Sequence, residues 1–303
     1  MTVGFLRGVF WAIGHAYRQK LRQQWRSRLW LTKRRPFKHR TARGLIFRLH
    51  PREYIDRFIF VDDFYEKRLL DFLRAYYERR PGGVALDVGA NIGNHALYLK
   101  DLFKEIHCFD PNPVVVERLR DNISLNCANN ISIHPVGLSN CTAELPFLIN
   151  LHGDLGSSRF VEASQSDTIS LPVVVGDDYI KQAGLSSVTF VKIDVEDCEA
   201  QVFEGLRRTI ARHRPVVAFE YHGSRLNLRN FDQIAAVLDG YIFAEARHAV
   251  SDLSLRTKFL WHISHRGRPT LSIFSQPERR TYDNILAFPD EATFEQFKAV
   301  GAA

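Results

Sequence analysis

Short apolar runs alternate with segments of helical spacing between residues 84 and 239. The runs predict strands at residues 84–88, 105–109, 131–136, 189–193 and 215–220. Apolar residues recur every three or four positions at 94–104, 112–125, 198–212 and 230–239, which is the spacing of amphipathic helices. This alternation predicts an α/β fold in which helices cover both faces of a parallel sheet.

The pattern changes after residue 240, where strand-like pieces such as "YIFAEA" and "NILAF" follow one another without helices between them. These pieces predict antiparallel edge strands, so we expect a seven-stranded, mostly parallel sheet. The stretch "NLHGDLGSSRF" (150–160) is expected in a long loop between the third and fourth strands.

The N-terminal part has a different pattern. One apolar stripe over residues 5–29 predicts a helix with arginines and lysines on its other faces. A basic, proline-broken linker (32–43), a strand (44–53) and a helix (62–80) are predicted to follow. We therefore divide the chain into a basic arm, residues 1–43, and a main domain, residues 44–303, with its core at 62–290.

Charge supports this division. Residues 1–52 contain 14 lysines and arginines and no acid, whereas the remaining 251 residues carry 27 bases and 34 acids, a net charge of −7. No apolar run approaches the roughly 20 residues that span a bilayer, and the N-terminal stretch lacks the features of a secretory signal. The four cysteines form no CxxC pair, so we expect reduced thiols in a cytoplasmic protein.

The first predicted strand ends in a glycine-spaced turn, "DVGANIG" (87–93), and a helix follows. Turns of this kind face the crevice where doubly wound sheets bind ligands. Gly89, Asn91 and Gly93 are expected to approach such a ligand closely, but the third glycine of a dinucleotide site is missing. Asp87 would repel a pyrophosphate and attract a cation. The cationic nucleoside S-adenosylmethionine is therefore the predicted cofactor, with its methionine part at this turn.

The second strand ends in Asp110, within "FDPNP" (109–113), 23 residues after Asp87. An acid at this strand end is placed to accept hydrogen bonds from both ribose hydroxyls. The alternative is that Asp110 only caps the next helix.

These segments resemble the FkbM family of S-adenosylmethionine-dependent methyltransferases. The resemblance rests on "DVGANIG" (87–93), "FDPNP" (109–113), "VGLS" (136–139) and "VKIDVEDCEAQVFEGL" (191–206), and it runs from about residue 44 to 223. It implies a Rossmann-like class I methyltransferase fold and O-methylation of sugars or polyketide-type small molecules. The family more often has Glu at the position of Asp110 and usually has Gly at that of Asp197.

The fourth strand ends in Asp194-Val195-Glu196, and strand alternation points the two acids the same way. We expect one to hold the cofactor or the acceptor and the other to take the proton of the acceptor hydroxyl. His222, after Glu220 at the end of the fifth strand, is a further candidate base. The alternative is that Asp194 and Glu196 only cap the helix that begins near Cys198. Asp194, Glu220 and a further acid also suit Mg²⁺, although no metal site is defined by spacing.

The favoured function is O-methylation of a sugar hydroxyl on a glycan, glycolipid or related small molecule. The basic arm leaves RNA ribose methylation as an alternative, because it offers phosphate-binding charge. A catalytically silent membrane- or nucleic-acid-binding protein of the same fold is a third possibility. Residues 5–43 also have the composition of an interfacial anchor for anionic lipid. The alternative is a helix that packs on the body of the protein or on a dimer partner.

Overall fold

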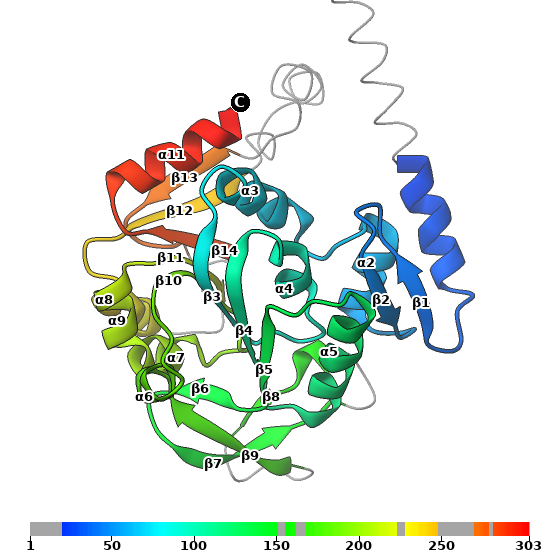
Figure 1. Ribbon diagram of the computed structural model, residues 1–303, viewed down its shortest axis with the longest axis horizontal. Coiled ribbons are helices and arrows are strands. Elements are labelled where there is room, and N and C mark those ends of the chain that lie inside the picture. The colour runs from blue at the N-terminus through cyan, green and yellow to red at the C-terminus, as the bar shows by residue number, and fades with distance from the viewer. Residues whose placement is uncertain are drawn as a thin grey trace, which may run out of the picture.

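The computed structural model describes residues 20–150, 155–161, 168–222, 228–247, 270–278 and 281–302 (Figure 1). Its largest element is an eight-stranded sheet with the order β13-β12-β14-β11-β10-β3-β4-β5. The strands are β3 (Gly82–Val88), β4 (Phe103–Phe109), β5 (Ile131–His134), β10 (Val188–Ile193), β11 (Val216–His222), β12 (Ile242–Arg247), β13 (Thr270–Phe274) and β14 (Thr281–Phe288).

The five strands from β5 to β11 run parallel to one another, and β14 pairs antiparallel with β11. The predicted fold class and the antiparallel edge after residue 240 are therefore confirmed. The predicted number of seven strands is one too low, because β13 pairs antiparallel with β12 and extends the edge.

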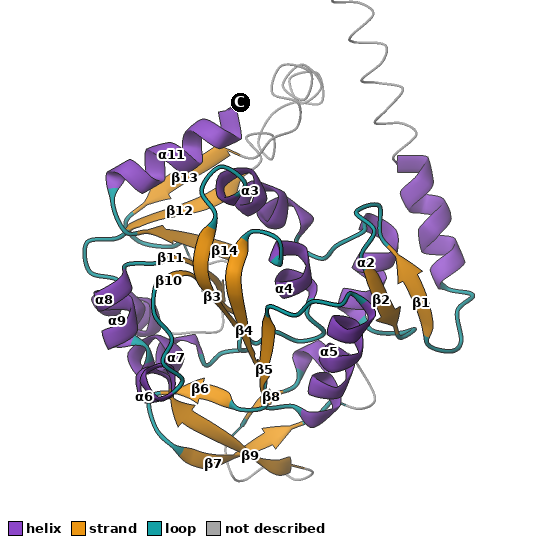
Figure 2. Cartoon of the chain, viewed as in Figure 1, coloured by secondary structure: helices purple, strands orange, loops and turns teal. Residues whose placement is uncertain are grey.

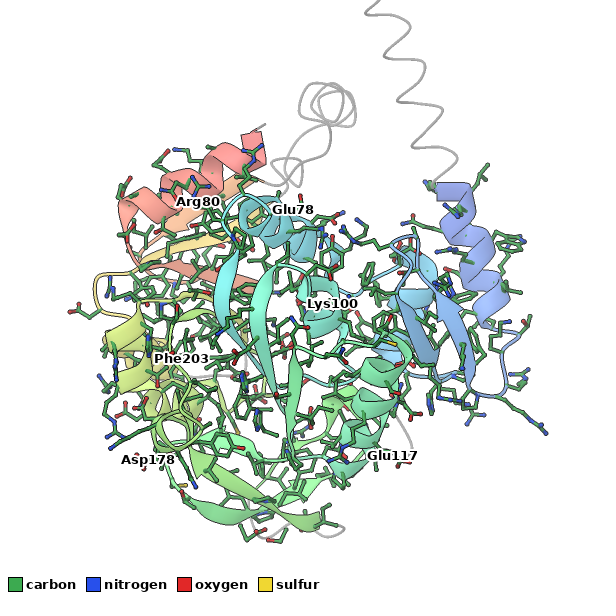
Figure 3. The ribbon with its side chains drawn as sticks, viewed as in Figure 1. Glu78, Arg80, Lys100, Glu117, Asp178 and Phe203 are labelled. Carbon is green, nitrogen blue, oxygen red and sulfur yellow. The ribbon has the colours of Figure 1, made fainter. Side chains whose placement is uncertain are left out.

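Helices cover both faces of the sheet, as Figure 2 shows. One face carries α3 (Lys67–Tyr77), α4 (Asn94–Leu99), α5 (Pro113–Leu125) and α11 (Glu291–Ala302), and the other carries α6 (Gly176–Gln182), α7 (Glu199–Gly205), α8 (Arg207–His213) and α9 (Leu228–Val237). Neighbouring strand residues alternate between the two cores: Ala85 belongs to the first and Leu86 to the second. In Figure 3 the labelled Glu117 and Asp178 are exposed on the outer surfaces of α5 and α6, whereas Phe203 of α7 is fully buried.

A second sheet of four strands, in the order β6-β9-β7-β8, lies between β5 and β10 in the sequence. Its strands are β6 (Gly137–Ser139), β7 (Ala143–Leu148), β8 (Arg159–Phe160) and β9 (Thr168–Val175), and the short helix η1 (Leu155–Ser157) precedes β8. The prediction of one long loop between the third and fourth predicted strands is wrong, because this sheet forms there; residues 151–154 of the stretch 150–160 lie outside the described residues. Alternate residues such as Phe147, Leu171 and Val173 are buried, so the small sheet has one apolar inner face.

The N-terminal residues form a separate small layer beside α5. A helix over residues 20–30 precedes β1 (Phe37–Arg40), β2 (Ile46–Leu49) and α2 (Tyr54–Asp62). The predicted helix over residues 5–29 is confirmed for the described residues 20–29, and its residues 5–19 lie outside the described part of the chain. The linker prediction for 32–43 is wrong where β1 pairs with β2. The helix predicted over residues 62–80 is shorter in the structure, where it corresponds to α3. Within the described residues, no helix is long and apolar enough to cross a membrane.

Side chains of α5 determine where this layer sits. Asn122 and Asn126 accept hydrogen bonds from the backbone N–H groups of Arg48 and Ile46, at 2.8 Å each. Arg118 forms a buried ion pair with Asp56 of α2 at 2.6 Å. The layer therefore attaches to the helix that begins at the end of β4.

Candidate functional site

The glycine turn after β3 is held against two neighbouring strands. The N–H of Gly89 donates to the carbonyl oxygen of Phe109 at the end of β4, at 2.9 Å. Gly89 has φ +84°, and a Cβ atom there would lie 1.8 Å from the backbone oxygen of Asp194, at the end of β10. Only glycine fits this approach. The carboxyl ends of β3, β4 and β10 thus meet at one point, as the sequence predicts.

Asp110 connects the turn to the next helix. Its carboxylate accepts a hydrogen bond from the N–H of Asn91 at 3.1 Å and another from the N–H of Asn112 at 3.0 Å. The N-cap of α5 is Asn112, whose side chain accepts from the N–H of Val114. Capping therefore does not explain Asp110. Burial raises the pKa of Asp110 to about 6, although these two N–H donors favour the carboxylate.

A pocket opens at these strand ends. Among the residues predicted to bind or react, its lining includes Gly89, Asn91, Asp110, Asp194 and Glu196. The opposite wall is apolar and comes from the second sheet, through Leu138, Leu145, Phe147, Phe160 and Val173. An enclosed pocket that is polar on one side and apolar on the other suits a nucleoside with a flat base and a hydroxyl-bearing ribose. Sequence periodicity did not reveal this second wall.

Asp87 and Gly93 do not line the pocket. Gly93 lies behind the turn, where a Cβ atom would come within 2.6 Å of Leu119. Asp87 is only 3% exposed. Burial raises its pKa, although the charges of His95 and Lys192 and a backbone hydrogen bond from Ala96 oppose the rise. A buried carboxyl group beside the turn is compatible with a cationic ligand in the pocket.

Three acids gather at the ends of β10 and β11. The carboxylate oxygens of Asp194, Glu196 and Glu220 lie within 4.8 Å of one another. The structure therefore brings together two of the three predicted catalytic residues, Asp194 and Glu196, with Glu220, which the sequence grouped with Asp194 as a possible Mg²⁺ ligand. The third, His222, ends β11, but its side chain lies outside the described residues. Helix α7 starts at Glu199, and its N-cap residue is Cys198 rather than either predicted acid.

Lys192 supplies the positive charge of this cluster. It is 1% exposed, and its Nζ lies 3.2 Å from Asp194 and 3.8 Å from Glu66. Glu66 in turn lies 2.8 Å from His95 and accepts a hydrogen bond from Asn284. The ammonium of Lys192 thus already compensates Asp194, so we do not assign a Mg²⁺ site to the cluster.

The pKa values of the acids diverge because of these contacts. Burial and the charge of Asp194 raise the pKa of Glu220 well above its ordinary value. Although burial opposes it, the Lys192 ammonium lowers the pKa of Asp194. At neutral pH, Asp194 is therefore the carboxylate and Glu220 the protonated partner that donates to it.

Backbone strain accompanies this cluster. Glu196 and Asp197 have φ values of +52° and +77°, in the region that favours glycine. The sharp turn they form carries Glu196 to the pocket wall. Strain of this kind is often found where side chains must be presented to a ligand.

An aromatic group flanks the acids on the side of α2. The rings of Tyr54, Phe58 and Tyr65 lie with centroids 4.9–6.0 Å apart, and Tyr54 is 49% exposed. Burial and then the nearby charges of Glu66 and Asp194 raise the pKa of Tyr65, so its phenol faces the acidic cluster. Sequence spacing does not predict this aromatic group, nor the roles of Lys192, Glu66 and His95. A lone lysine within the apolar run "VTFVKI" (188–193) is the signal for a buried ion pair.

Comparison with known proteins identifies the family of this chain. The family model described as "Methyltransferase FkbM domain" matches residues 87–247, which begin at Asp87 and include every predicted site residue. The match spans more than half of the chain, so the family predicted from the sequence is confirmed.

Three curated proteins are also similar. The hexuronic acid methyltransferase AglP of Haloferax volcanii is 26% identical over 44% of this chain and 54% of its own length. The 2-O-methyltransferase NoeI of Sinorhizobium fredii is 27% identical over 45% of this chain and 62% of its own, and the 31-O-demethyl-FK506 methyltransferase FkbM of Streptomyces tacrolimicus is 28% identical over 51% and 68%. The chain thus matches little more than half the length of the first two relatives. On the family match, the chain belongs to the FkbM methyltransferase domain family.

Proposed function

We propose that this protein is an S-adenosylmethionine-dependent O-methyltransferase that acts on a sugar hydroxyl of a glycan, glycolipid or related small molecule. The observation that carries the proposal is the pocket in which Gly89, Asn91 and Asp110 face the apolar wall of the second sheet and open onto Asp194. The relatives are named as a hexuronic acid methyltransferase, a 2-O-methyltransferase and a 31-O-demethyl-FK506 methyltransferase, which supports an oxygen acceptor.

The residues divide into two groups in this proposal. Asp110 accepts the ribose hydroxyls, and Gly89 and Asn91 hold the methionine part. Asp87 and Gly93 act from behind the turn, as a buried negative charge and as a packing position. When bound, S-adenosylmethionine supplies an electrophilic methyl group on a sulfonium.

On the acceptor side, the ionised Asp194 and the adjacent Glu196 are the groups that orient the hydroxyl and receive its proton. Glu220 and Lys192 hold Asp194 in place, the first through a shared proton and the second through its charge. The exposed ring of Tyr54, together with Phe58 and Tyr65, offers apolar faces on which a sugar ring can stack. His222 stays a candidate base from the sequence.

Calorimetric titration with S-adenosylmethionine, S-adenosylhomocysteine and NAD tests the proposal. We expect micromolar binding of the two adenosyl ligands and none of NAD. A screen of uronic acids, hexoses and an RNA oligonucleotide with labelled methyl donor then identifies the acceptor class. Binding of NAD alone, or of none of the three ligands, would contradict the cofactor assignment, and methylation of RNA alone would contradict the acceptor.

A further inference from the structure

The helix over residues 20–30 attaches to the protein by one face only. Gln23 donates to Asp62 at 2.5 Å, Arg26 pairs with Asp63 at 3.2 Å, and Trp30 is 5% exposed, with its ring 5.6 Å from that of Phe60. These contacts fix the helix on α2 and β1, at the edge of the molecule in Figure 1.

The opposite face exposes large apolar side chains. Leu21 and Trp25, one helical turn apart, are 45% and 63% exposed, and Leu31 just after the helix is 72% exposed. Of the six exposed large apolar residues in the described part of the chain, these three come from eleven consecutive positions. Such a patch on an otherwise charged surface indicates an interaction site.

Cations accompany this patch in the chain. Exposed basic residues of the same segment are Lys20, Arg22, Arg28, Arg34, Arg35, Lys38 and Arg40, and residues 1–52 contain no acid. The acids that the helix contacts, Asp62 and Asp63, lie on its packed face. The outer face therefore combines apolar anchors with unopposed positive charge.

We propose that this outer face docks on an anionic lipid surface, with Leu21, Trp25 and Leu31 entering the headgroup region and the basic residues pairing with lipid phosphates. The positive charge of this face favours an anionic partner. The exposed aliphatic side chains favour lipid over nucleic acid, because a phosphate backbone offers Leu21 and Leu31 no apolar region in which to be buried. Docking would hold the pocket of the main domain near membrane-borne acceptors, although it does not depend on the methyltransferase proposal.

Vesicle sedimentation tests the proposal with the full chain. We expect binding to vesicles of phosphatidylcholine with phosphatidylglycerol and little binding to phosphatidylcholine alone. Arg22→Glu/Arg28→Glu and Leu21→Ser/Trp25→Ser are each expected to weaken partitioning by at least about tenfold. The matched controls, Arg79→Glu/Arg212→Glu and Ile273→Ser, alter exposed residues far from the helix in sequence and are expected to bind as the wild type does. Thermal melting confirms that each variant is folded.

The depth to which Trp25 inserts into the bilayer distinguishes docking on lipid from binding to other polyanions. Brominated lipids are expected to quench the fluorescence of the wild type more than that of Trp25→Phe. Absence of binding to anionic vesicles, unchanged binding of the Leu21→Ser/Trp25→Ser variant, or equal quenching of Trp25→Phe overturns the proposal. Tight binding of an RNA oligonucleotide without vesicle binding also overturns it and makes the surface a nucleic-acid site.

Discussion

The carboxylate of Asp110, at the end of β4, accepts a hydrogen bond from the backbone N–H of Asn91 in the turn after β3, at 3.1 Å. This contact places an acid and a glycine turn, 19 residues apart in the chain, on one wall of the pocket. Each carboxyl oxygen accepts one backbone N–H, so each has a further lone pair for a ribose hydroxyl.

Asp110→Asn should weaken binding of S-adenosylhomocysteine about 10- to 100-fold, since a hydrogen bond to a charged acceptor is worth about 1.5–3 kcal/mol. Because the pKa of Asp110 is about 6, wild-type affinity should also fall as the pH drops below 6, whereas the affinity of Asp110→Asn should not. Titration calorimetry at pH 5 and pH 7.5 checks both effects.

Asp178→Asn, at an exposed position of α6, is the control for that experiment and should bind as the wild type does. Equal affinity of Asp110→Asn and wild type at both pH values would remove Asp110 from the ribose site.

Gly89→Ala should destabilise the protein by several kcal/mol and abolish ligand binding, because the new Cβ would meet the Asp194 backbone oxygen at 1.8 Å. Gly44→Ala is a matched control, since Gly44 has φ +85° but no atom within 4 Å of an added Cβ. Its free energy of unfolding should fall only by the cost of a left-handed backbone conformation for alanine, about 1–2 kcal/mol. Urea denaturation of the two variants measures the difference, and similar losses would mean that the contact with Asp194 does not matter.

The parts of the site that were predicted from the sequence are those in which one local pattern determines the geometry. A strand followed by glycines places Gly89 at a sheet end whatever the rest of the chain does, and Asp110 follows from the next strand. Parallel topology then brings Asp194 to the same edge. Local pattern and tertiary structure agree at these positions, so the inference from spacing holds.

The parts that were missed depend on contacts between distant segments. The second sheet forms because β7 and β9 pair across about 20 residues, and the pattern within either strand does not reveal its partner. Strand β1 lies in a basic segment whose pairing follows from the docking of β2 on α5. Lys192 lies in the predicted strand 189–193. Asp194 is close to it in the chain, but its other partner, Glu66, precedes α3, and spacing does not reveal this distant contact.

Lys192→Met should lower the free energy of unfolding by about 3–5 kcal/mol, because it leaves the partly buried carboxylates of Glu66 and Asp194 without the buried Lys192 ammonium. Lys67→Met is the control: Lys67 pairs with Asp71 on the surface of α3, and loss of such a pair costs at most about 1 kcal/mol. Chemical denaturation at pH 7 compares the two. Adding Glu66→Gln to Lys192→Met should restore part of the loss, and additive effects would show that the pair is not coupled.

Glu199→Gln should change how stability depends on pH. Glu199, 2% exposed at the start of α7, accepts a hydrogen bond from the N–H of Val195, while its Oε2 is buried without a partner in the described residues. Burial raises its pKa from 4.5 to about 7. A raised folded-state pKa means that its stabilising effect is complete below pH 4.5 and is lost as the pH rises through 7.

Over this range the wild type should therefore lose about 3 kcal/mol relative to Glu199→Gln, whose amide stays neutral. Guanidinium denaturation of both proteins at pH 5 and pH 8 measures the change. Glu117→Gln, on the exposed face of α5, is the control. The gap between its free energy of unfolding and that of the wild type should be the same at both pH values. If the wild type and Glu199→Gln keep a constant difference, Glu199 is already ionised in the folded protein at pH 5, and a positive charge or a water must reach its buried oxygen.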